Sequence, residues 1–188
     1  MQTHDKKHSI RKDIAIRKKL LSEETATIHS RKICNRLEQS DIFQKAGCIA
    51  LYHAMNDEVR TSELIEEWHK KKTIVLPVIS GDNINFHVYK GIDKITTGVS
   101  GIMEPTGTEQ VCIEKIDLFI VPGVAFDRQC NRMGRGKGYY DRYLSDSNKP
   151  TIGICFDFQL FEQIPTEGHD IKMDMIITEN VTLSSHHQ

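Results

Sequence analysis

Hydrophobic residues in the first part of the chain recur at helical intervals. Ile10, Ile14 and Leu21 are separated by four and seven residues among lysines and arginines, which predicts a basic amphipathic helix over residues 6–21. Ser22 followed by two glutamates is typical of a helix start, with a capping hydroxyl and an acidic first turn. Two helices are therefore expected before the first strand.

Short apolar runs bounded by polar residues then predict buried strands. They cover residues 48–52, 73–78, 84–89, 118–121, 151–155 and 175–178. Turn residues at 80–83 predict a hairpin between the second and third of these strands, and helices are expected after Thr61, over 139–144 and over 158–163. This order predicts a single three-layer α/β/α domain over residues 1–188, with a mixed, mostly parallel sheet.

The composition gives the chain as a whole almost no net charge. Its 188 residues include 25 lysines and arginines and 26 aspartates and glutamates, for a formal net charge of −1. This balance argues against a protein whose main role is to coat nucleic acid or an anionic membrane. The sequence also lacks an apolar run of the roughly 18 residues that span a bilayer, and the apolar core of a signal peptide. We expect a cytoplasmic monomer that binds neither nucleic acid nor membrane.

Positive charge is concentrated in one segment, where glycines alternate with cations. It reads Arg132-Met133-Gly134-Arg135-Gly136-Lys137-Gly138 and is followed by Tyr139-Tyr140-Asp141. Glycine adopts positive φ and lacks a Cβ, so backbone N–H groups can turn inward around a phosphate. Arginine adds a bidentate fork and lysine a mobile point charge, a pair that suits a polyphosphate. We call residues 132–138 the glycine–cation loop and interpret it as an anion-binding loop.

The position of this loop supports a ligand site, because it follows the predicted strand 118–121, and ligands of open α/β sheets collect beyond the carboxyl ends of strands. Two familiar glycine motifs do not fit. A P-loop needs Ser or Thr after its lysine, but Gly138 follows Lys137, and the dinucleotide motif would need glycine where Tyr139 stands. An exposed basic turn remains an alternative, as does a non-catalytic RNA- or nucleotide-binding protein that uses stacking tyrosines.

Two polar segments in the first third of the chain each have two interpretations. Lys7 and Arg11 share one helix face, so they either grip the oxygens of a phosphate or form a solvated basic face. Asn56-Asp57-Glu58 follows the first predicted strand, so it either offers a carboxylate to the N–H donors of a substrate or makes an ordinary turn.

Acidic residues late in the chain are also ambiguous. Asp141 either holds Mg²⁺ against polyphosphate oxygens or stabilises the start of the helix. His169-Asp170 and Asp174 precede the last predicted strand and either bring a second acidic ligand to the same metal or belong to a turn.

The glycine–cation loop together with Tyr139-Tyr140-Asp141, preceded by the residues Val121-Pro122-Gly123-Val124-Ala125-Phe126-Asp127, closely resembles the signature of the 5-formyltetrahydrofolate cyclo-ligase family. The basic first helix and the segments 55–58, 102–105 and 169–170 follow in the family's order and spacing. The resemblance implies an ATP- and Mg²⁺-dependent conversion of 5-formyltetrahydrofolate to 5,10-methenyltetrahydrofolate, with release of ADP and phosphate. In the family mechanism, ATP phosphorylates the formyl oxygen and N10 then closes the ring.

The resemblance also implies roles for individual residues. ATP would be bound by Lys7, Arg11, Arg132, Met133, Gly134, Arg135, Gly136, Lys137, Gly138, Tyr139 and Tyr140. The folate would be bound by His53, Glu58, Arg135, Gly136, Lys137, Gly138 and Tyr139. Asp141 and Asp170 would hold magnesium, and Arg135 and Lys137 would stabilise the transferred phosphoryl group as catalytic residues. Both tyrosines would help to close the site.

This chain departs from the family pattern near residue 100. Many relatives have an aromatic residue where this chain has Ser100, and a proline where it has Met103. Stacking on the folate ring is then expected to be weaker, or to be supplied by Tyr52 or Phe86.

Overall fold

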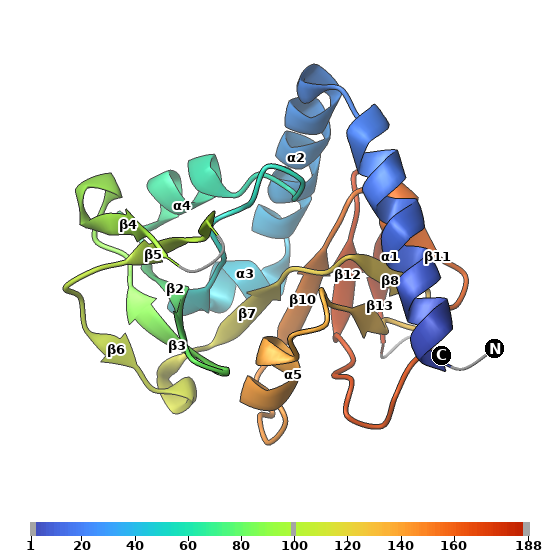
Figure 1. Ribbon diagram of the computed structural model, residues 1–188. Helices are drawn as coiled ribbons and strands as arrows, with labels where there is room; N and C mark the ends of the chain where they lie inside the picture. The colour runs from blue at the N-terminus through green and yellow to red at the C-terminus, as the bar shows by residue number, and fades with distance from the viewer. Residues whose placement is uncertain (1–2, 99–100, 186–188) are drawn as a thin grey trace.

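The computed structural model describes residues 3–98 and 101–185 and consists of a central sheet covered by helices on both faces (Figure 1). The helices are α1 (Thr3–Leu20), α2 (Glu23–Glu38), α3 (Asp41–Lys45), α4 (Ser62–Trp68) and α5 (Tyr139–Tyr143). Short 3₁₀ turns are η1 (Ile92–Lys94), η3 (Ile113–Lys115) and η4 (Asp157–Gln159). Among the described helices, none is long and apolar enough to cross a membrane.

The central sheet contains eight strands in the order β13-β12-β10-β7-β1-β2-β3-β6. Their bounds are β1 Cys48–Ala50, β2 Thr73–Ser80, β3 Asn83–Val88, β6 Gln110–Val111, β7 Leu118–Val121, β10 Thr151–Ile154, β12 Met175–Ile177 and β13 Thr182–Ser184. The five middle strands pair in parallel, whereas β13, β3 and β6 pair antiparallel at the edges. The predicted mixed, mostly parallel sheet is confirmed.

Alternating side chains of these strands build two separate cores. Ile49, Ile74 and Leu118 face α2, α3 and α4, whereas their neighbours Val75 and Phe119 face the side on which α5 packs. Successive residues of a strand point to opposite faces, so a nearly continuous apolar run is what a strand buried on both faces requires. The predicted three-layer α/β/α architecture is therefore confirmed.

Two small sheets extend this frame, one of three strands and one of two. The first joins β11 (Leu160–Phe161), β8 (Ala125–Asp127) and β9 (Arg132–Met133), and the second pairs β4 (Ile95–Thr97) with β5 (Met103–Pro105). In Figure 1, α1 runs beside β8 and β11, and Ile10 packs there against Ala125 and Met133. Helix α1 thus lies against the three-stranded sheet that contains the first residues of the glycine–cation loop.

The expected helix over residues 158–163 is wrong. This segment begins in the 3₁₀ turn η4 and continues as strand β11, which pairs in parallel with β8. The side chain of Gln159 accepts a hydrogen bond from the backbone N–H of Phe156 at 3.0 Å and donates to the carbonyl oxygen of Val124 at 2.9 Å. These bonds end the turn early and attach it to a segment 35 residues away in sequence.

Candidate active site

The glycine–cation loop connects β9 to α5 beyond the carboxyl end of β7. Gly136 and Gly138 have φ values of 101° and 67°, which fall in the left-handed region, and Gly138 is the residue before the first turn of α5. A side chain at either position would strain the backbone. The loop is therefore shaped by glycine where the chain turns from strand into helix, as the sequence predicted.

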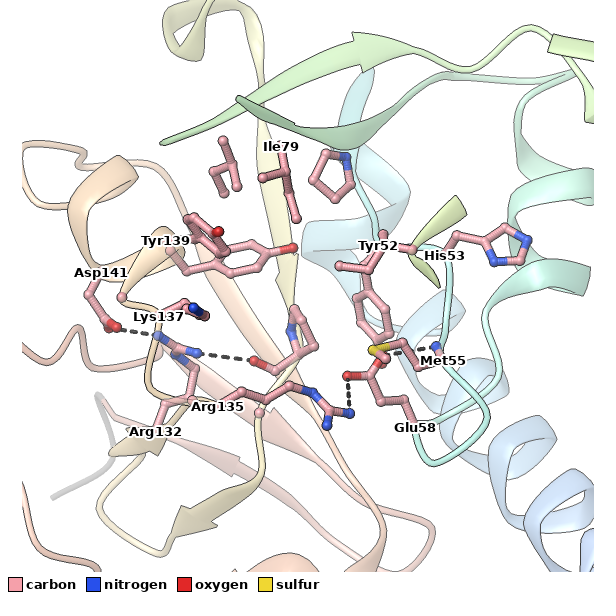
Figure 2. A pocket seen from close by; sticks show the side chains of 18 residues that line it. Tyr52, His53, Met55, Glu58, Ile79, Arg132, Arg135, Lys137, Tyr139 and Asp141 are labelled. Atoms are coloured by element: carbon pink, nitrogen blue, oxygen red, sulfur yellow. Dashed lines mark hydrogen bonds and ion pairs between the residues drawn. The ribbon is translucent and has the colours of Figure 1, made fainter. Parts of the chain in front are cut away.

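Next to the loop lies a cavity of about 300 Å³, and Figure 2 shows the side chains that line it. One wall comes from the loop and α5, and the opposite wall from the segment after β1. The lining residues are Tyr52, His53, Met55, Glu58, Pro77, Ile79, Ile84, Ile102, Pro122, Gly123, Arg132, Gly134, Arg135, Lys137, Gly138, Tyr139, Tyr140 and Asp141. The lining combines apolar side chains from the β2–β3 hairpin and its surroundings with cations from the loop, which suits a ligand with a flat apolar part and an anionic partner.

Arg132 and Asp141 form a buried ion pair at this cavity. The Nη2 of Arg132 lies 2.6 Å from Oδ1 of Asp141, and the exposed fractions of the two side chains are 4% and 12%. Arg132 also donates to the carbonyl oxygen of Pro122 at 3.2 Å, and Asp141 Oδ1 accepts from the N–H of Ile171 at 3.2 Å. Asp141 thus joins α5 to the segment next to Asp170.

Arg135 forms a more exposed pair on the other side of the cavity. Its Nη2 lies 2.6 Å from Asp57 and 3.1 Å from Glu58, and Figure 2 shows the side chain reaching from the loop to Glu58. Asp57 also pairs with Lys18 of α1 at 3.0 Å. Burial alone would raise the pKa of Asp57, but the two cations outweigh burial and lower the pKa below its usual value.

The basic face of α1 points toward this region and is not a solvated face. Lys7 is buried, and its Nζ lies 2.6 Å from Asp170 and 2.7 Å from Glu167. Burial alone would lower the pKa of Lys7, but hydrogen bonds to the two carboxylates raise it above its usual value. Arg11 donates from Nε to the carbonyl oxygen of Gly134 at 3.0 Å. The solvated interpretation of these two residues is wrong.

Carboxylates that suit a divalent cation lie at the same end of α1. Glu167, His169 and Asp170 each place one ligand atom within 4.8 Å of the others in the described part of the chain. Carboxylate oxygens are ligands that Mg²⁺ accepts, so the donor chemistry fits this metal. Asp141 is not in this group, although its bond to Ile171 brings it to the adjacent segment. Asp174 instead accepts hydrogen bonds from Thr151 at the start of β10.

The remaining expected residues do not all line the cavity. Tyr52 lines it, whereas Phe86 packs against Phe119 in the core and is only 1% exposed, so the expectation that Phe86 stacks on a ligand is wrong. The ring of His53 points away from the other labelled side chains in Figure 2. Burial lowers the pKa of His53, which favours a neutral ring.

The two positions that depart from the family pattern are Met103 and Ser100. Met103 lies in β5, where Thr97 donates a hydrogen bond to its sulfur, and Ile102 beside it lines the cavity. Ser100 lies outside the described residues.

Some residues that contribute to the site were not assigned a role from the sequence. Lys18 and Glu167 hold site residues through ion pairs, and Ile79 and Ile84 line the apolar wall. A signal for Lys18 existed, because Lys7, Arg11 and Lys18 are separated by four and seven residues and so share one helix face. Glu167 had no comparable local pattern, since its partner Lys7 is 160 residues away.

Comparisons with known proteins identify the family of this chain. The sequence model described as the 5-formyltetrahydrofolate cyclo-ligase family matches residues 3–179. A probable 5-formyltetrahydrofolate cyclo-ligase of Schizosaccharomyces pombe is 30% identical over 84% of this chain and 87% of its own length. The 5-formyltetrahydrofolate cyclo-ligase of Haemophilus influenzae is 32% identical over 81% of this chain and 82% of its own length.

Solved structures show the same relationship in three dimensions. The NMR structure of the Aquifex aeolicus 5,10-methenyltetrahydrofolate synthetase superposes with a TM-score of 0.89 and 35% identity, covering 97% of this chain and 94% of its own. The structure of a 5,10-methenyltetrahydrofolate synthetase from Mycoplasma pneumoniae gives a TM-score of 0.75 and 28% identity, covering 92% of this chain and 98% of its own. The chain belongs to the 5-formyltetrahydrofolate cyclo-ligase family.

Proposed function

We propose that the cavity beside the glycine–cation loop is where this cyclo-ligase converts 5-formyltetrahydrofolate to 5,10-methenyltetrahydrofolate, with ATP cleaved to ADP and phosphate. The main support for this cavity is that different kinds of side chain line its two sides. The Glu58 carboxylate and apolar side chains such as Ile79 lie on one side, and the loop cations Arg132 and Lys137 lie on the other, while Arg135 reaches across to Glu58. A folate ring with N–H donors matches the first side, and a polyphosphate matches the second.

In this proposal the nucleotide lies along the loop toward α1. Its phosphates are bound by the backbone and side chains of residues 132–139, together with Lys7 and Arg11. The positive-φ glycines support this role, because they let backbone N–H groups approach an anion closely. Asp141 and Asp170 would hold Mg²⁺, which would neutralise phosphate charge. Lys7 now pairs with Asp170, so we expect nucleotide binding to redistribute the partners of Lys7.

The folate lies on the opposite side, with its N–H donors toward Glu58 and His53 near its edge. The formyl oxygen then faces Arg135 and Lys137. Transfer of the γ-phosphoryl group to this oxygen turns a poor leaving group into phosphate, and attack by N10 on the activated carbon closes the ring and expels phosphate. The protein contributes alignment and electrostatic stabilisation, since phosphoryl transfer requires little else from side chains.

Lys137 is suited to stabilise the moving phosphoryl group. It lines the cavity, and within the described residues no ion pair engages its ammonium, whereas Arg132, Arg135 and Lys7 all have carboxylate partners. An uncommitted ammonium on a flexible stem can follow charge as it develops.

The inward pairing of Arg132 and Arg135 also argues against the alternative of an open RNA-binding surface. We further propose that the protein is a monomer located in the cytoplasm.

The proposal is tested by following the methenyl chromophore with purified protein, ATP, Mg²⁺ and 5-formyltetrahydrofolate. We expect turnover that requires all three additions, and Lys137→Ala should reduce kcat about 10²- to 10³-fold, as loss of one transition-state donor does. Lys115→Ala, at an exposed lysine outside the cavity lining, is the matched control and should behave as wild type. Absence of product with the wild-type protein, or normal turnover by Lys137→Ala, would contradict the respective assignment.

A further inference from the structure

Helix α5 carries three tyrosines whose hydroxyl groups have different surroundings. The hydroxyl of Tyr139 donates to the carbonyl oxygen of Gly81 at 3.4 Å, and the ring of Tyr143 packs against Phe86 and Phe119. Tyr140 also lines the cavity, yet its hydroxyl is buried and has no hydrogen-bond partner among the described residues. Buried hydroxyl groups are nearly always paired, so an unpaired one at a ligand cavity calls for an acceptor supplied by the ligand.

The surroundings of Tyr140 make its hydroxyl a donor. Burial, followed by the nearby Glu58 carboxylate, raises the pKa of Tyr140 well above its usual value, and the smaller opposing effect of Arg132 does not cancel them. The group therefore stays protonated at neutral pH and offers its hydrogen. Glu58 lines the same cavity, and its carboxylate oxygens accept from the backbone N–H of Met55 and from Arg135, each at 3.1 Å. Each oxygen has a second lone pair with which it can accept from a ligand. The cavity thus presents an acceptor pair and a neutral donor to one ligand.

This pattern complements one edge of a 2-amino-4-oxo pyrimidine ring. That edge carries two N–H donors, at the 2-amino group and at N3, next to one acceptor, the carbonyl oxygen O4. We propose that Tyr140 donates its hydroxyl hydrogen to O4 of the pterin while Glu58 accepts from the two N–H groups, which makes Tyr140 a specificity-determining residue for the folate. The inference rests on the proposed function, because it takes the folate to occupy this cavity. This proposed contact with the pterin replaces the expectation that Tyr140 binds ATP.

Tyr140→Phe isolates the hydroxyl, since it keeps the ring and its contacts with Phe86 and Arg132. We expect the KM for 5-formyltetrahydrofolate to rise about tenfold, which corresponds to about 1.4 kcal/mol. The KM for ATP should stay near the wild-type value. Tyr143→Phe removes the same atom three residues along the helix, outside the cavity lining, and should change neither KM. A purely structural role predicts a different result: loss of a needed contact would lower the urea midpoint, whereas removal of an unpaired hydroxyl should leave it unchanged or raise it.

Calorimetric titration with 5-methyltetrahydrofolate distinguishes O4 from the formyl oxygen and does not depend on turnover. This folate keeps O4 but lacks the formyl oxygen, so Tyr140→Phe should weaken its binding by the same factor of about ten. Unchanged affinity for this probe, or a rise in the KM for ATP instead, would overturn the contact with O4. If the wild-type protein bound the probe but produced no methenyl product, the proposed function would fail while the titration still decided the role of Tyr140.

Discussion

Two arginines of the glycine–cation loop lie three residues apart but meet very different surroundings. Arg132 is 4% exposed and is held by Asp141 and by the carbonyl oxygen of Pro122. Arg135 is 45% exposed and crosses to Asp57, which is itself 40% exposed, and to Glu58. Both residues line the same cavity. Their difference separates a cation that is fixed by buried partners from a cation whose partners are partly exposed and can be exchanged for a ligand.

The physical reason for this separation is solvent. A buried charge that loses its partner is costly because water cannot replace that partner, so Arg132 is expected to keep Asp141 throughout the reaction. An exposed pair is screened and gains little net free energy, so Arg135 can exchange its carboxylates for phosphate oxygens at small cost. We therefore expect substitutions of Arg132 to affect folding first and substitutions of Arg135 to affect catalysis first.

Arg132→Met should give the largest effect on stability. It leaves the Asp141 carboxylate buried without its cation, and breaking a buried pair in this way typically costs about 3–5 kcal/mol of the free energy of unfolding. Urea denaturation monitored by circular dichroism measures this loss. Arg128→Met is the matched control, because Arg128 precedes the loop with a 52% exposed side chain and pairs with the 85% exposed Glu162. A loss for Arg132→Met no greater than that of the control would remove the distinction between the two loop arginines.

Arg135→Gln should have its main effect on turnover. If Arg135 stabilises the transferred phosphoryl group, kcat should fall about 10²- to 10³-fold, as for other donors lost from a charged transition state. The free energy of unfolding should change by only about 1 kcal/mol, because Arg135 and Asp57 are 45% and 40% exposed and solvent screens their pair. Arg128→Gln again serves as the control, with kcat near the wild-type value. A stability loss in Arg135→Gln as large as that in Arg132→Met would show that both arginines serve the fold.

Asp57→Asn should have an intermediate effect, because Asp57 is shared by Lys18 and Arg135. Without the charge of Asp57, Arg135 is expected to bind Glu58 more fully and compete with the folate for that carboxylate. The KM for 5-formyltetrahydrofolate should then rise severalfold with a smaller change in kcat, and stability should fall by about 1 kcal/mol. Steady-state kinetics measure the first effect and urea denaturation the second. Asp13→Asn, which breaks the exposed Asp13–Arg17 pair of α1, should change neither.

The fold was predictable wherever a local pattern decides the structure. Strand β7 was predicted with its observed bounds, Leu118–Val121, because a short apolar run between polar residues has few alternatives. The segment 158–163 was predicted wrongly because its apolar spacing also fits a helix. Its strand depends on pairing with β8, and that partner is distant in sequence.

The site followed the same rule. The glycine–cation loop could be proposed as an anion-binding loop from its composition, and the structure places glycine at its positive-φ positions 136 and 138. The partners of its cations could not be identified, since Asp57 lies 78 residues from Arg135. The unpaired hydroxyl of Tyr140 also had no sequence signal, because Tyr139 beside it has the same side chain and a different environment. Such distinctions arise only from packing between distant segments.

The smallest expected effect near neutral pH is the change in stability with pH that arises from the titration of Asp57. Lys18 and Arg135 outweigh the opposing effect of burial and lower the pKa of this carboxyl in the folded state. A lowered pKa means that the unfolded chain takes up the proton first, so the stabilisation is fully present above the unfolded value of about 3.9 and is lost as the pH falls through the folded value. The difference in the free energy of unfolding between wild type and Asp57→Asn should therefore be the same at pH 7 and pH 5. It should decline toward zero below about pH 4. Urea denaturation at pH 7, 5, 4 and 3 tests this, and a difference that persists undiminished at pH 3 would mean that the shape of the side chain, and not its charge, holds Arg135 across the cavity.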